Sequence, residues 1–400
     1  MDEFAKVGAL FMNPKTRTKR IILVLTAILI AAPLFSANIT VPSLEIYSRA
    51  WDDSGFALDS YGDMELQLDG GYKFGGAMKL GFTSSSLETA TFNDSLTFKS
   101  VSVTLRDLFG LPLDFTYFIG QGDTFGTGEL FTPYFGTPLL SSRYTSYLHF
   151  PDPLEQAYNF YQGIYTVYGT GGKFEYAPPE KNWLLWLYIY QDSSPAFLDT
   201  AVDPIIFSSR QGSLDIRAAF NLEKVQLEAF LGATLPTSDS AIGYLRSGLF
   251  LHAGTEKVEF LAEIGMPRWR PLDDAFGPDL FFLLVEQRLH LGRISIVPTF
   301  FWRPGYYQQE PNVTGVEAMD INLDLQFHGK EESLVSGGVE GNFVYQTAPT
   351  SETTAKAIPY IQLSTPGVVY KAQLNTKVWP FDLSDLSDTF AVFLSIQAAF

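Results

Sequence analysis

The sequence ends in FAVFLSIQAAF, residues 390–400, and this stretch alternates between two kinds of side chain. Apolar side chains occupy every even position: Phe390, Val392, Leu394, Ile396, Ala398 and Phe400. The odd positions are small or polar apart from Phe393. Because successive side chains of a β-strand point to opposite faces, the stretch predicts a strand with one wholly apolar face.

The composition favours one large β architecture over several α/β domains. Aromatic residues make up 15% of the 400 residues and charged residues only 18%, with 33 Gly and 23 Pro, which suits many strands separated by many turns. The chain has no cysteine, which excludes disulfides, thiolate metal sites and a catalytic thiol. The net charge of -17 argues against nucleic acid as a partner.

The N-terminal region has the layout of a secretory signal peptide. Basic residues Lys15, Arg17, Lys19 and Arg20 precede an apolar run, IILVLTAILIAAPLF, over residues 21–35. This run is short for a membrane-spanning helix, which needs about 20 residues. We therefore expect a signal peptide over 1–37, with Met12 as an alternative start and a retained anchor as the alternative role.

The rest of the chain repeats the alternating pattern of its last stretch. For example, Ile321, Leu323, Leu325 and Phe327 alternate with Asp320, Asn322, Asp324 and Gln326. Eighteen such runs can be counted from 44–51 to 389–400, and sixteen is the alternative count. Long connections, such as 52–63 and 122–157, alternate with short ones, which is expected when all strands cross one slab. A soluble all-β fold is the alternative, but its strands average five or six residues.

These features resemble a bacterial outer-membrane β-barrel of the porin-like class. The resemblance is architectural and covers the mature chain; the stretch Pro133-Tyr134-Phe135-Gly136 is only distantly similar to a loop motif of general porins. It implies an all-β fold, a closed antiparallel up-and-down transmembrane β-barrel over 38–400, in the cell outer membrane. It also implies that Phe400 belongs to the signal read by the assembly machinery. Since a last strand must close on the first, 389–400 should pair with 44–51.

Charged side chains on the polar faces of the runs are predicted to line a lumen. An eighteen-stranded barrel is too wide for its own side chains to fill. Acids lead bases among these residues, so we expect at most a modest preference for cations; the alternative is that each is simply paired or solvated. The predicted pore-lining residues are Glu65, Asp69, Arg106, Asp114, Asp215, Arg217, Glu228, Arg246, Glu259, Glu263, Glu286, Arg288, Arg303, Asp320, Asp324, Glu340, Lys371 and Lys377.

The connection 122–157 is predicted to fold into the lumen and constrict it. It is rich in aromatic residues, which would be unfavourable fully in water, and we expect it to pack against Trp186 and Tyr188. An outward loop that covers the rim is the alternative. The residues singled out in this constriction loop are Phe125, Phe131, Tyr134, Phe135, Arg143, Tyr144 and Tyr147. A second aromatic set, near strand ends, is predicted to form interfacial girdles: Trp51, Tyr72, Phe74, Tyr176, Trp183, Tyr190, Trp302 and Trp379.

A passive channel for small solutes is the leading functional hypothesis. An adhesion or structural protein with long outer loops and a carrier of apolar molecules are the alternatives. No enzyme is expected, because the four histidines are isolated in sequence and no catalytic motif is present. No cofactor or metal is expected. The expected partners are outer-membrane lipid, the assembly machinery and small solutes, with a homo-oligomer left open.

Overall fold

The structure of the chain is a computed structural model, and it describes most of the sequence after residue 36. The described residues are 37–52, 56–71, 73–84, 95–144, 163–192, 211–236, 243–271, 275–304, 317–329, 334–348, 351–382 and 389–398. The predicted signal peptide, apart from Ala37, lies outside them, as do Tyr147 and Phe400.

Eighteen β-strands account for nearly all regular structure in the described residues. They are β1 (Ala37–Asp52), β2 (Phe56–Gly70), β3 (Phe74–Ser84), β4 (Ser95–Leu105), β5 (Leu113–Phe125), β6 (Tyr165–Tyr176), β7 (Trp183–Asp192), β8 (Gln211–Leu222), β9 (Val225–Pro236), β10 (Tyr244–Gly254), β11 (Val258–Trp269), β12 (Phe282–Leu291), β13 (Ile294–Arg303), β14 (Glu317–His328), β15 (Val335–Ala348), β16 (Glu352–Thr365), β17 (Val368–Trp379) and β18 (Phe390–Ala398). Short helices are η3 (Leu108–Gly110), α3 (Phe131–Phe135) and η5 (Pro278–Leu280). None of the helices in this part of the chain is long and apolar enough to cross a membrane.

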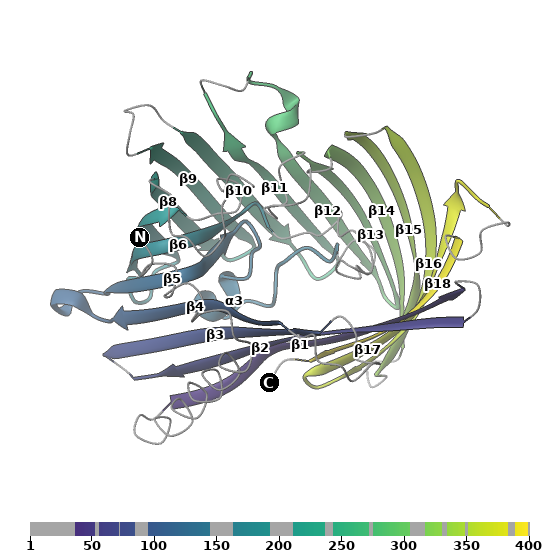
Figure 1. Cartoon of the computed structure of the whole chain (residues 1–400), viewed down its shortest axis with the longest axis horizontal. Helices are drawn as coiled ribbons and strands as arrows, with labels where there is room; N and C mark the ends of the chain where they lie inside the picture. The colour runs from purple at the N-terminus through teal and green to yellow at the C-terminus, as the bar shows by residue number, and fades with distance from the viewer. Residues whose placement is uncertain are drawn as a thin grey trace, which may run out of the picture.

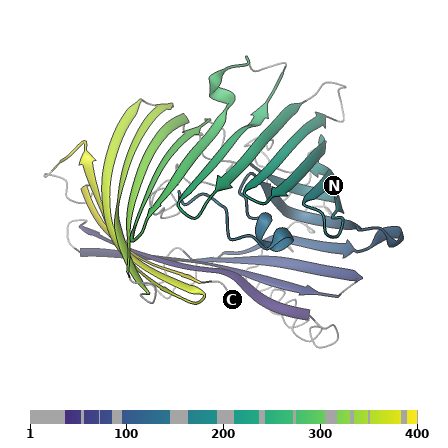
Figure 2. The same ribbon diagram turned by 180° about the vertical axis from the view of Figure 1, so that it is seen from behind.

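The strands form one antiparallel, up-and-down sheet (Figures 1 and 2). Each strand pairs with its neighbours in sequence, and β1 also pairs with β18. In that last pairing Leu44 lies opposite Ala398 and Ala50 opposite Val392. The predicted pairing of the last strand with the first is therefore confirmed.

The first hairpin is longer than predicted. Residues 52–63 were expected to form a long loop, but β1 ends at Asp52 and β2 begins at Phe56, so the loop prediction is wrong. The ladder places Arg49 opposite Asp59 and Ala50 opposite Leu58, so residues 56–63 continue the hairpin as a strand. Ala37, expected to end the signal peptide, is the first residue of β1.

The two faces of the sheet differ sharply in polarity. In β8, Leu214 and Ile216 are 43% and 47% exposed, while Ser213, Asp215 and Arg217 on the opposite face are buried. In β18, Leu394 and Val392 are exposed and Ser395 is buried. The outer face is thus apolar, and the inner face carries the polar and charged side chains. Soluble monomers rarely expose a continuous apolar surface of this kind.

The largest hydrophobic cluster lies on the inner face, not between two sheets. It joins inward-facing residues of β5 to β13 with residues of the segment that follows β5. Its buried members are Phe118, Phe125, Leu130, Phe131, Leu140, Tyr144, Ile164, Tyr165, Val167, Leu184, Trp186, Tyr188, Tyr190, Ala219, Phe230, Phe250, Leu261, Phe282, Leu284 and Phe301. In Figure 1, α3 lies within the curve of the sheet, where this cluster forms.

Candidate functional site

The segment between β5 and β6 begins later than predicted. The predicted connection starts at residue 122, but β5 continues to Phe125 because Thr124 pairs with Thr166 and Phe125 with Tyr165 after a register shift. Phe125 is therefore a buried strand residue and not part of a loop. Of the connection between β5 and β6, the structure describes 126–144, called here the inner segment, and residues 163 and 164.

Aromatic contacts hold the inner segment against the sheet. The ring of Phe131 lies 5.8 Å from that of Phe250 on β10, and the ring of Tyr134 lies 5.6 Å from Trp186 on β7 in an edge-to-face arrangement. Phe131 and Trp186 are almost completely buried. Burying such a side chain contributes about 1.5–3 kcal/mol, so these contacts favour the packed position of the segment.

A polar clamp fixes the later half of the inner segment to β12. The hydroxyl of Ser142 donates to Glu286 over 2.6 Å, and the main-chain N–H of Arg143 donates to the same carboxylate over 3.0 and 3.2 Å. The guanidinium of Arg288 donates to the carbonyl of Ser141 over 2.7 Å and to Glu286 over 2.6 Å. Glu286 and Arg288, which share one face of β12, thus bind three consecutive residues of the segment.

Two further carboxylates anchor the two ends of the inner segment. At its start, the N–H of Gly126 donates to Glu228 over 2.9 Å, and Glu228 also accepts from Arg217 over 2.9 Å. At its described end, the hydroxyl of Tyr144 donates to Asp320 over 2.7 Å, and Asp320 also accepts from Arg303 over 3.1 Å. Each buried carboxylate is therefore paired with a cation, as buried charges require.

Several predicted pore-lining residues consequently lie beneath the inner segment. They point inward, as the alternation indicated, but they are buried and bind the segment or one another. These residues are Arg217, Glu228, Glu286, Arg288, Arg303 and Asp320. Their first role in this structure is to position the segment.

A second buried network surrounds Arg246 on β10. Its guanidinium donates to Asp215 on β8 over 2.6 and 2.9 Å, and to the hydroxyls of Thr234 and Tyr190 over 2.7 and 2.9 Å. Gly232 lies opposite both Asp215 and Arg246 in the ladders of β9. The missing side chain at Gly232 leaves the space in which the two charged groups meet.

The placement of Tyr190 in this network corrects its predicted role in an interfacial girdle. Tyr190 is buried and donates to Asp215 over 2.7 Å. In β7 the even-numbered side chains, including Trp186 and Tyr188, face inward, while Leu185 and Ile189 are exposed. The run WLLWLYIY is apolar on both faces, so its alternation alone did not show which face is which.

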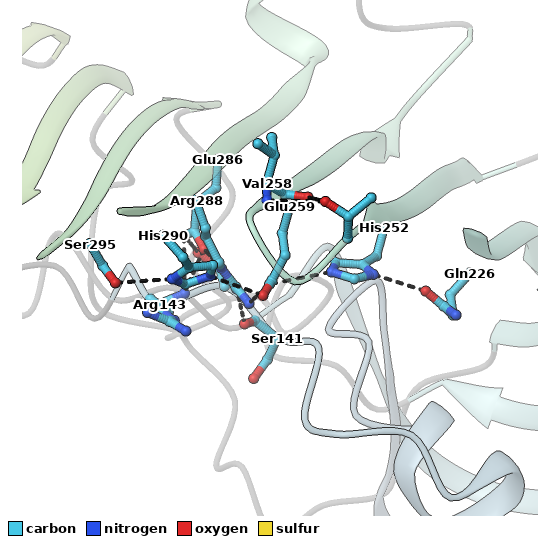
Figure 3. A network of polar contacts seen from close by, with 12 residues as sticks. Ser141, Arg143, Gln226, His252, Val258, Glu259, Glu286, Arg288, His290 and Ser295 are labelled. Atoms are coloured by element: carbon cyan, nitrogen blue, oxygen red, sulfur yellow. Dashed lines mark hydrogen bonds and ion pairs between the residues drawn. The ribbon is translucent and has the colours of Figure 1, made fainter. Parts of the chain in front are cut away.

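Three histidines lie near the short-turn ends of β10, β12 and β14, namely His252, His290 and His328. Figure 3 shows the first two. Glu259 lies 3.1 Å from Nε2 of His290 and 3.6 Å from Nε2 of His252. Ser295 bridges His290 and His328, at 3.0 and 2.8 Å. The histidines are isolated in sequence but not in space. No group of His, Asp or Glu in the described residues is arranged to hold a metal ion.

The remaining predicted lining residues are spread over other parts of the molecule. Asp324 accepts from Tyr360 over 2.9 Å, and Lys371 lies over the ring of Tyr360. Glu263, Glu340 and Lys377 lie in β11, β15 and β17.

Arg106 does not lie in a strand. It follows β4, and its Nε lies 3.9 Å from Oδ2 of Asp114. Asp107 and Phe109, in the turn between the two residues, have positive φ angles. Asp69 lies in β2, but its side chain is outside the described residues.

A cavity of about 440 Å³ lies between the inner segment and a wall to which β2, β3, β5, β7 and β8 contribute. Its lining combines charged, aromatic and small residues: Glu65, Lys79, Gln121, Gly122, Asp123, Thr124, Thr127, Glu129, Leu130, Pro133, Tyr134, Trp186 and Arg217. Glu65, Tyr134 and Arg217 were predicted as site residues. Lys79, Asp123 and Glu129 were missed, although the inner-face parity of β3 could have identified Lys79.

Nearly all the charged groups around this cavity have partners. Lys79 and Lys99 each lie 3.1 Å from Glu65. Asp123 accepts from Lys173 over 3.1 Å and from the hydroxyl of Tyr188 over 2.6 Å.

Glu129 differs from the other acids of the cavity. Its side chain is exposed to the cavity, and within the described residues its carboxylate makes no hydrogen bond or ion pair. The surrounding protein raises the pKa of the Glu129 carboxyl by desolvation, an effect that the positive charge of Lys79 partly offsets.

No family model and no curated protein matches the chain. Among solved structures, OccK8 (OprE) of Pseudomonas aeruginosa matches with a TM-score of 0.52 and 8% identity, over 91% of this chain and 98% of that one. The outer membrane protein opdK of Pseudomonas aeruginosa matches with a TM-score of 0.49 and 10% identity, over 91% of this chain and 99% of that one. A triple mutant of the Rh. blastica porin matches with a TM-score of 0.46 and 8% identity, over 91% of this chain and all of that one. The likeness to OccK8 together with the strand pairings shows that the chain has the fold of that protein, an antiparallel up-and-down sheet in which the first strand pairs with the last.

Proposed function

We propose that the chain is a passive channel of the bacterial outer membrane, in which eighteen strands close into a transmembrane barrel. Small solutes pass between the inner segment and the wall to which β2, β3, β5, β7 and β8 contribute. The observation that carries this proposal is the anchoring of 126–144 across the inner face, which leaves the 440 Å³ cavity beside it.

The surface properties of the sheet support a membrane location. Strands of 9 to 16 residues are long enough to cross a bilayer, which takes about 9–11 residues when the strand is tilted. The exposed apolar side chains of the outer face would bury against lipid, while the inner face would remain polar. The pairing of β1 with β18 leaves no unpaired edge between them.

The lining of the cavity supports hydrophilic solutes over apolar ones. Five charged residues contribute to it, namely Glu65, Lys79, Asp123, Glu129 and Arg217. Desolvating such groups to bind an apolar molecule would be costly. A carrier of apolar molecules is therefore less well supported than a channel, and a purely adhesive protein would need no such passage.

Planar-bilayer recordings of the refolded protein test the proposal. We expect discrete open-channel steps, and we expect larger steps when residues 127–143 are replaced by a short Gly-Ser linker. A matched control replaces the turn 178–181 with Gly and Ser and should leave the step size unchanged. Absence of steps from correctly folded protein would contradict the channel, and unchanged steps in the linker variant would contradict the constriction.

A further inference from the structure

The charged groups that line the cavity come from the strand wall and from the inner segment. On the wall of β2 to β4, Lys79 and Lys99 share the carboxylate of Glu65, so among these three described side chains two ammonium groups face one carboxylate. The Lys79 side chain is 45% exposed. The inner segment contributes Glu129 to the same cavity. Among the described residues its carboxylate makes no hydrogen bond or close ion pair, although the positive charges of Lys79 and Arg217 act on it.

The other charges on the side of the inner segment are compensated. Asp123 accepts from Lys173, and Arg217 pairs with Glu228 over 2.9 Å. Among the described side chains that line the cavity, a solute therefore meets the ammonium group of Lys79 on the wall and the carboxylate of Glu129 on the segment. A solute that carried only one sign of charge would satisfy one group and be repelled by the other.

Apolar and aromatic surface lies beside the carboxylate of Glu129. Tyr134 is 41% exposed and packs its ring against Trp186, and Leu130 and Pro133 also line the cavity. The ring of Tyr134 can contact an apolar substituent or an ammonium group. The volume of about 440 Å³ lies within the range of roughly 300–1,000 Å³ that is usual for small-molecule sites.

We propose that this cavity is a binding site for small zwitterions of the amino-acid or short-peptide class. The ammonium group of the solute binds Glu129, its carboxylate binds Lys79, and an apolar side group packs on Tyr134. The proposal rests on the channel function above, because the solute reaches the cavity by way of the lumen.

Three related probes test this assignment. L-phenylalanine carries both charges, its amide lacks the carboxylate, and N-acetyl-L-phenylalanine lacks the ammonium group. We expect L-phenylalanine to interrupt single-channel current at the lowest concentration. The variant E129Q should weaken its binding about tenfold or more, since hydrogen bonds to charged groups are among the stronger ones. The variant K79M should weaken binding of L-phenylalanine but not of the amide.

Controls separate this inference from the channel function. The variant E180Q, in the exposed turn 178–181, should bind all probes as the unchanged protein does, and circular dichroism confirms that each variant is folded. Equal effects of the three probes, or unchanged binding in E129Q, would overturn the inference while open-channel steps still support the channel. If no steps occur, the channel proposal fails, and calorimetric titration of the refolded protein with the same probes decides the inference on its own.

Discussion

The hydroxyl of Ser142 lies 2.6 Å from a carboxylate oxygen of Glu286 and donates to it, although the two residues are 144 positions apart. The same carboxylate accepts the main-chain N–H of Arg143. One side chain on β12 thus satisfies both a side-chain and a main-chain donor of the inner segment. Charge-assisted hydrogen bonds of this kind are stronger than neutral ones. A substitution of Glu286 removes several of them together and should therefore loosen the segment.

We predict that Glu286→Gln loosens the inner segment. The amide of glutamine has one acceptor oxygen where the carboxylate of Glu286 has two. The hydrogen bonds that hold the segment should therefore weaken by roughly 1.5–3 kcal/mol. The expected result is larger and noisier single-channel current, with faster proteolysis within 126–144. Gln287→Ala, on the exposed face of the same strand, is the matched control. Current and proteolysis equal to those of the unchanged protein would show that Glu286 does not hold the segment.

The ion pair between Arg246 and Asp215 should contribute strongly to stability when only one partner is removed. Both side chains are buried, and breaking such a pair leaves an uncompensated charge at a cost of about 3–5 kcal/mol. We predict that Arg246→Met lowers the denaturant midpoint of unfolding markedly. The double variant Arg246→Met with Asp215→Asn should lose less free energy of unfolding than the two single variants lose together. Strictly additive losses would contradict an interaction between the two residues.

Gly232 gives a separate test of the same network. A Cβ at this position would overlap the carboxylate of Asp215 and approach the guanidinium of Arg246. Gly232→Ala should therefore destabilise the protein, even though alanine normally suits a strand better than glycine. Gly212→Ala is the control, because a Cβ there meets nothing within 4 Å. Equal midpoints for the two variants would mean that the carboxylate moves aside freely.

Alternation predicted the strands well because it depends on local geometry alone. The strand FAVFLSIQAAF and its pairing with the first strand followed from period-two patterning and from the need to close an edge. The pattern also placed Asp215, Glu228 and Glu286 on the inner face. It could not show that the inner segment covers some of these residues, since that depends on contacts across more than a hundred positions.

The incorrect predictions have physical causes of the same kind. Residues 52–63 were expected to form a loop, because the register that pairs 56–63 with the first strand, with Trp51 opposite Ala57 and Ala50 opposite Leu58, is not visible in a local pattern. Tyr190 was assigned to the membrane interface because its strand is apolar on both faces. His252, His290 and His328 looked isolated, since only the register of five neighbouring strands brings them together.

The charge of Glu129 should make ion selectivity depend on pH. Desolvation raises the pKa of this carboxyl above its ordinary value, so it takes up a proton at a higher pH than a solvated glutamate would. Protonation removes a negative charge from the cavity. We therefore predict that the preference for cations, measured as the reversal potential in a salt gradient, falls as pH is lowered, and that the fall begins above the ordinary titration range of glutamate.

The variant Glu129→Gln isolates this effect from other titrating groups. It removes the negative charge at every pH while it leaves His252, His290 and Glu259 in place. Its cation preference should match that of the unchanged protein at low pH. It should also change little over the pH range in which the unchanged protein loses its preference. If the variant and the unchanged protein lose selectivity in parallel, the change comes from another group, and the assignment of Glu129 as the free acid of the constriction is wrong.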